Sequence, residues 1–132
     1  MFVDYKHKCV PAAILGESHE LYASNRVMRE VSYRYGGLKE LGEVLEKNDF
    51  TSAKEIVWLL TALANEGAAA HNINHPDDRR GLLDPEAFDM LITDGELETN
   101  APLAVKALNI YYGRDITPDD EPEGEPKNPI AG

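Results

Sequence analysis

The sequence predicts a mainly α-helical protein, with about five helices packed round a central buried helix at about residues 52–72 and a small N-terminal β-hairpin. Three observations favour this fold class. Apolar residues recur with a helical period from residue 25 onward, no proline lies between Ala12 and His75, and the apolar run at 56–64 carries no charge. A helix that is apolar on every side must be covered on every side, so we expect this run to form the hub of the core.

Composition and charge exclude several classes of protein. The 132 residues include 24 Asp and Glu against 13 Lys and Arg, a formal net charge of −11. We expect no membrane span, because no stretch approaches the roughly 18–20 apolar residues that one needs. We expect no disulfide scaffold, because Cys9 is the single cysteine. The first eight residues lack the basic-then-apolar order of a secretory signal. Strong acidity argues against a nucleic acid as partner, since like charges repel.

Charge and proline content divide the chain in two. Residues 114–132 hold four of the eight prolines, six acidic residues and no aromatic residue. Such a segment cannot bury enough apolar surface to offset its ordering entropy. We therefore expect residues 1–113 to form a single helical domain with an N-terminal hairpin, and residues 114–132 to form a disordered, acidic, Pro-rich tail.

The expected hairpin pairs residues 12–15 with residues 18–23. Gly16 followed by Glu17 suits a tight turn. Pro11 must then sit at the start or edge of a strand, because it has no N–H to donate to a ladder. A two-stranded hairpin is barely stable alone, so we expect it to lie on the helices.

Two amphipathic helices are expected after the hairpin. From Asn25, the apolar residues fall on one stripe and the charged residues fall elsewhere. Ser24 can cap the start of this helix, and Gly36 can end it with a positive φ. A second, short helix begins at Leu38 and carries its glutamates opposite its leucines.

The third helix is the predicted hub. Ser52 and Glu55 have the spacing of a capping box, in which each side chain satisfies a free amide at the helix start. Trp58 is expected in the core. Small residues further along, among them Gly67, would let another element approach closely. We expect this helix to end near residues 72–74.

Two more helices complete the predicted domain. Asp84 and Pro85 open a fourth helix as its cap and first residue, and Asp94 with Gly95 stops it. A last helix is expected at about residues 100–112, with its proline tolerated in the first turn.

The sequence gives no positive support for catalysis. His71 and His75 lie four residues apart, on one face of a helix, but the glutamate of an H-E-x-x-H zinc motif is missing between them. A metallohydrolase that uses these two histidines is a minor alternative. Cys9 stands among basic residues that would lower its pKa, but in a segment poorly suited to hold a nucleophile in register with a base. We expect no catalytic residue, no cofactor and no metal.

The chain resembles the small tail assembly chaperones of long-tailed bacteriophages and prophages. Residues 25–30 and 35–38 look like the family's opening helix and its Tyr-Gly end, residues 58–72 like its central helix, and residues 82–86 like the acid-capped start of its next helix. Together these passages extend the likeness over about residues 12–112, and it lies in helix pattern rather than in site residues.

The resemblance implies a specific role. Such proteins act in the host cytoplasm while the tail is built, and they are absent from the mature virion. They bind the long, helical tape measure protein, keep it soluble and help to recruit tail tube protein. A small acidic domain could cover apolar stripes of that partner by the helix-in-groove mode, and like-charge repulsion would keep the complex soluble. The sequence leaves self-association open.

The expected partner-binding residues are apolar and aromatic. The last helix ends in two adjacent tyrosines, so at least one ring must face away from that helix's own core; an interaction surface and an ordinary exposed tyrosine both fit this pattern. We expect a partner to contact Leu82, Leu83, Phe88, Tyr111 and Tyr112. The alternative function is an acidic DNA mimic or inhibitor that binds a host nucleic-acid-binding enzyme, which the net charge favours and the nearly balanced residues 1–75 weaken.

Overall fold

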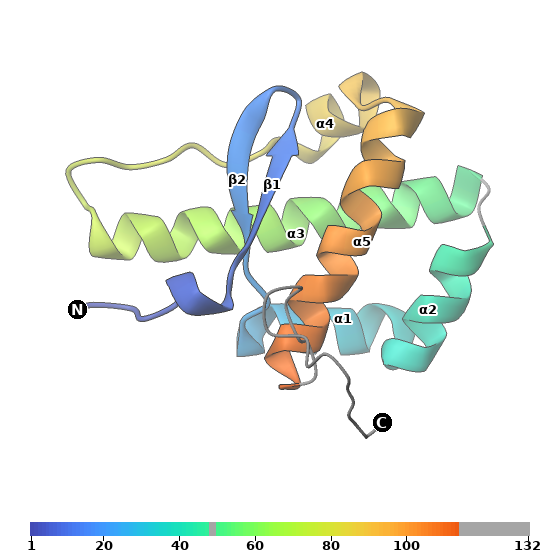
Figure 1. Ribbon diagram of the computed structural model, residues 1–132, viewed down its shortest axis with the longest axis horizontal. Coiled ribbons are helices and arrows are strands. Elements are labelled where there is room, and N and C mark those ends of the chain that lie inside the picture. The colour runs from blue at the N-terminus through green and yellow to red at the C-terminus, as the bar shows by residue number, and fades with distance from the viewer. Residues whose placement is uncertain (48–49, 114–132) are drawn as a thin grey trace, which may run out of the picture.

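The computed structural model describes residues 1–47 and 50–113, and it confirms the expected fold class. The described residues form η1 (Lys6–Lys8), β1 (Val10–Ile14), β2 (Glu17–Leu21), α1 (Asn25–Tyr35), α2 (Leu38–Glu46), α3 (Phe50–Asn74), α4 (Pro85–Leu91) and α5 (Asp94–Tyr111). Figure 1 shows α3 running across the middle of the molecule, crossed by the hairpin and by α5. The predicted tail at 114–132 lies outside the described residues. None of the described helices is both long and apolar enough to cross a membrane.

The long helix α3 is the hub of the core, as predicted. No residue from Glu55 to Asn72 is exposed, and three leucines of its apolar run are fully buried. The capping box is wrong, because α3 begins at Phe50 and Ser52 already lies in its first turn. Glu55 has a different role: it accepts hydrogen bonds from Arg34 and Tyr35 of α1. Helix α3 therefore starts earlier than the predicted capping box indicated.

The hairpin turns one residue earlier than expected. Ile14 pairs with Glu17, which leaves Leu15 and Gly16 as the two turn residues, both with positive φ. Two positive φ values match the twist of a two-residue hairpin. The backbone N–H of Leu15 donates to the Glu96 carboxylate at 2.8 Å, so α5 ties down this strained residue.

Strand β2 packs on α3 and β1 packs on α5, so the hairpin bridges the two longest helices. Gly67 makes this possible, since a Cβ there would lie 1.9 Å from the backbone oxygen of Glu20. On the other side, the Asn100 side chain donates to the carbonyl of Ala13 at 3.1 Å. The sheet is thus held through backbone contacts on both of its strands.

Helices α1 and α2 follow the prediction closely. The Ser24 hydroxyl accepts from the N–H of Val27, and Gly36 ends α1 with a φ of 94°. The Ser24 hydroxyl also donates to Glu66 of α3, which accepts two further bonds from Arg26. One carboxylate therefore fixes the start of α1 against the centre of α3.

Helix α5 is longer than predicted. It begins at Asp94, because the Thr93 hydroxyl accepts from the N–H of Glu96 and caps it there. Helix α4 has already ended at Leu91, so the Asp94–Gly95 pair does not stop it. Pro102 accordingly lies inside α5, not in its first turn.

Candidate partner-binding groove

The expected partner-binding residues divide between two places. Leu82 is 63% exposed, and Leu83 is half-buried with its backbone bonded to Asn65 of α3. Phe88 is 1% exposed, so the expectation that its side chain meets a partner is wrong: it is a core residue of α4. These three positions surround the start of α4.

Tyr111 and Tyr112 lie at the far end of α5 from that site (Figure 1). Their rings contact each other nearly at right angles, with centroids 5.2 Å apart, and are 37% and 48% exposed. The Tyr111 hydroxyl donates to the side-chain oxygen of Asn25 at 2.7 Å, which anchors this end of α5 to α1. The structure therefore does not unite the predicted residues into one surface.

His71 and His75 stack on each other at the end of α3. Their ring centroids are 4.3 Å apart and their planes differ by 20°. Nε2 of His71 lies 2.8 Å from the carbonyl oxygen of Asp78, and Nδ1 of His75 lies 3.1 Å from the carbonyl oxygen of His71. Each ring thus already has a backbone contact. In the part of the chain that the structure describes, no three His, Cys, Asp or Glu side chains gather as metal ligands.

The pKa of Cys9 is shifted in the direction opposite to the one that the sequence predicted. Burial, and then the negative charge of Glu20, raise the pKa of its thiol to about 12, outweighing Lys6 and Arg80. The thiol lies 3.5 Å from the carbonyl oxygen of Tyr5. A thiol held in its neutral form is a poor nucleophile.

A polar cluster beside Cys9 joins three segments of the chain. Glu20 accepts a hydrogen bond from the Tyr5 hydroxyl at 2.9 Å and forms ion pairs with Lys6 and Arg80 at 2.8 and 2.9 Å. Burial raises the pKa of Glu20, but the three donors outweigh burial and lower it. This cluster fixes the N-terminal segment and the 75–84 connection against β2.

Three asparagines of α3 fasten the same segments by two hydrogen bonds each. Their side-chain amides accept from a backbone N–H and donate to the carbonyl of the same residue. The pairs are Asn65 with Leu83, Asn72 with Arg80, and Asn74 with Val3. The C-terminal half of α3 is therefore a polar scaffold, already occupied by the chain itself.

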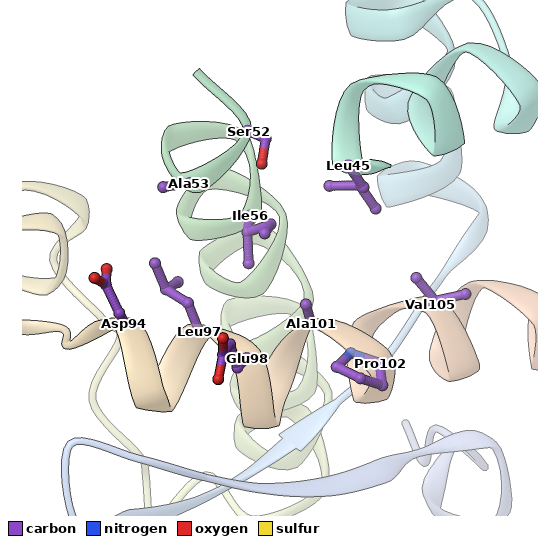
Figure 2. A pocket seen from close by; sticks show the side chains of 10 residues that line it. All are labelled: Leu45, Ser52, Ala53, Ile56, Asp94, Leu97, Glu98, Ala101, Pro102 and Val105. Atoms are coloured by element: carbon purple, nitrogen blue, oxygen red, sulfur yellow. The ribbon is translucent and has the colours of Figure 1, made fainter. Parts of the chain in front are cut away.

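The other end of α3 borders an open apolar groove of about 770 Å³. Figure 2 shows the first turns of α3 meeting α5, with Leu45 of α2 at one side of the opening. The lining residues come from these three helices: Leu45, Ser52, Ala53, Ile56, Asp94, Leu97, Glu98, Ala101, Pro102 and Val105. The groove was missed from the sequence because its α5 wall begins before the residue at which we expected that helix to start.

The chemistry of the groove is apolar with one acidic edge. Asp94 and Glu98 are exposed and lie four residues apart on α5, and none of the described residues that line the groove is basic. Pro102 has no N–H to donate to the carbonyl of Glu98, four residues earlier, which leaves one helix acceptor without its usual partner on this wall. The groove therefore combines an apolar floor with acceptors and negative charge along α5.

Comparison with models of protein families, with curated proteins and with solved structures gives no match to this chain. The groove therefore has to be interpreted from its own residues.

Proposed function

We propose that this protein is a tail assembly chaperone of a long-tailed bacteriophage or prophage. In this role it binds the tape measure protein in the host cytoplasm, keeps it soluble, helps to recruit tail tube protein, and is absent from the mature virion. The proposal rests on the resemblance of the helix pattern, and one structural observation supports it: an open apolar groove on a strongly acidic domain.

The groove suits a partner that is itself helical. Its walls are helices, and it offers an apolar surface on which the stripe of an amphipathic helix can be buried. A tape measure protein is long and helical, so its apolar stripes would associate with one another if left uncovered. Covering such a stripe removes the surface through which the partner would aggregate.

Net charge provides the second part of the function. Each bound copy adds a formal charge of −11 to the complex. Like-charged complexes repel one another, which opposes precipitation, and this effect weakens as salt screens the charge. Binding must also be reversible, because the tail tube later takes the place of the chaperone.

The direct test is an aggregation assay with the tape measure protein of the phage or prophage that the proposal implies. Light scattering is followed after dilution of that protein from denaturant, with and without this chain in several-fold excess. We expect scattering to be suppressed, with both proteins in one complex on size exclusion. An unrelated acidic protein of similar size and charge serves as the control. If the control suppresses scattering equally, or this chain does not suppress it, the proposal is wrong.

A further inference from the structure

We propose that the groove between α2, α3 and α5 seats about three turns of one amphipathic helix that carries two Lys or Arg residues, four positions apart, beside its apolar stripe. The identity of that helix as part of a tape measure protein rests on the proposed function. Its shape and charge follow from the groove alone.

The length of the groove sets the length of the helix. Its α5 wall runs from Asp94 to Val105, which at about 1.5 Å per residue is about 16 Å. That distance equals about three turns of a second helix lying alongside. Leu45 of α2 and Val105 of α5 flank the groove at the end away from Asp94 (Figure 2). An occupant therefore lies along the groove for about eleven residues, of which its apolar face makes the contacts.

The floor of the groove is shaped to receive larger side chains. Ala53 of α3 and Ala101 of α5 are small residues that line the groove (Figure 2). Ile56 and Leu97 supply larger apolar surface beside them. Small lining residues leave room for large side chains of a partner, as helix ridges fit into grooves. We therefore expect leucine-sized residues on the partner's stripe.

The acidic edge selects the charge of the occupant. Asp94 and Glu98 both line the groove, both are exposed, and their spacing places them on one face of α5. A parallel or antiparallel helix that carries basic residues with the same spacing meets both carboxylates at once. The edge thus requires basic residues on the flank of the partner's stripe that faces α5.

The same edge argues against occupation by this chain itself. Residues 114–132 contain six acidic residues against two basic ones, and a second copy carries a net charge of −11. Both would be repelled by Asp94 and Glu98. We therefore assign the groove to a different, basic-flanked helix.

Two peptides test the charge selection on the full chain. Both are eighteen-residue helical peptides with one leucine stripe; the basic peptide has lysines four apart beside the stripe, and the acidic peptide has glutamates there. By fluorescence anisotropy we expect the basic peptide to bind about threefold to tenfold more tightly at low salt, as two exposed ion pairs allow. Glu98→Lys leaves one carboxylate and one ammonium group at the edge, so this variant should lose the preference. Asp89→Lys, the same charge change at an exposed residue of α4, should retain it. Equal responses of the two variants would overturn the proposal.

A second pair of variants tests the apolar floor. Val105 lines the groove and is 38% exposed, and Leu91 of α4 is 60% exposed outside it. Val105→Glu places a carboxylate against the partner's leucines and should weaken binding of the basic peptide about tenfold or more, whereas Leu91→Glu should not. Because both side chains are partly exposed, both variants should fold, as circular dichroism will check. Unchanged binding by Val105→Glu would overturn the proposal.

The aggregation assay separates this inference from the proposed function. If the unmodified chain keeps the tape measure protein soluble and Val105→Glu does so equally well, the function stands and the groove assignment is wrong. If the unmodified chain fails in that assay but the peptides still show the charge preference and Glu98→Lys abolishes it, the groove assignment stands and the proposed function is wrong.

Discussion

Replacing Gly67 by alanine tests the closest approach in the fold. Strand β2 crosses α3 there, and a Cβ at position 67 would lie 1.9 Å from the backbone oxygen of Glu20 and 3.0 Å from its carbonyl carbon. Ordinary van der Waals contact begins at 3.4 Å. The strand must therefore move away from α3 by about 1.5 Å, because a backbone carbonyl cannot rotate aside as a side chain can.

Two opposing effects set the size of the change in stability. Forcing a methyl group into a packed contact costs about 1–3 kcal/mol, and the backbone contact at Glu20 places this case at the upper end. Alanine favours an α-helix over glycine by about 1 kcal/mol. The steric cost prevails, so we expect Gly67→Ala to lower the free energy of unfolding by about 2 kcal/mol.

Gly42→Ala is the matched control. Gly42 also lies inside a helix, α2, but a Cβ there would have no heavy atom within 4 Å. Only the helix preference remains, so this variant should be more stable by about 0.5–1 kcal/mol. Urea unfolding followed by circular dichroism at 222 nm measures both. If Gly67→Ala proves as stable as the parent protein, or shifts in the same direction as Gly42→Ala, the close packing of β2 on α3 is refuted.

Three further predictions concern other parts of the fold. Burial and then Glu20 raise the pKa of Cys9 to about 12, so at pH 8 its alkylation by iodoacetamide should be slower by two to three orders of magnitude in the folded than in the urea-unfolded chain; comparable rates would contradict this placement. Burial lowers the pKa of His19 below 6.5, and the hydrogen-bond donors around Glu20 hold the pKa of Glu20 below 4.5. As the pH falls below each of these values, the unfolded chain binds a proton before the folded chain does. The free energy of unfolding should therefore fall as the pH drops below 6.5 and again below 4.5, and a flat profile from pH 7 to 4 would contradict this. Asn65→Ala removes both amide bonds to the connection before α4 and should cost about 1–2 kcal/mol in urea unfolding, whereas Asn109→Ala on α5 should cost little; equal effects would contradict the role of that amide.

Local sequence signals predicted the elements whose ends are fixed locally. Ser24 and Gly36 bound α1 as expected, because a cap hydroxyl and a positive-φ glycine act on residues a few positions away. The burial of α3 followed from its uncharged apolar run in the same way. The close approach at Gly67 was also indicated by the small residues around it.

The start of α5 was missed because two local signals conflicted. Asp94 and Gly95 resemble a helix stop, and Pro102 resembles a helix start, yet the Thr93 hydroxyl caps a helix that runs through both. A proline inside a helix costs only the bond to one carbonyl and a steric strain that packing against β1 and α3 can offset. This error concealed the groove, since Glu98 was placed outside any helix.

Contacts distant in sequence could not be predicted at all. The amide of Asn65 reaches Leu83, eighteen residues away, and Glu20 pairs with Arg80, sixty residues away. Such pairs depend on how α3, the hairpin and the 75–84 connection are arranged in space, which no local pattern encodes. Asparagines inside a helix were the available signal, because they are poor helix formers and need another reason to be there.

The two ends of α3 differ in the kind of contact that they make. From residue 65 onward, its asparagines hold two other segments by directional hydrogen bonds, which leave little room for a partner to compete. Near Ala53 and Ile56, the side of α3 that faces α2 and α5 is lined by apolar contacts around an open groove. Apolar contacts have no fixed direction and can be completed by a side chain of another molecule. Under the proposed function, in which a helical partner is held and later released, this division is useful because binding at one end of α3 leaves the polar contacts at the other end intact.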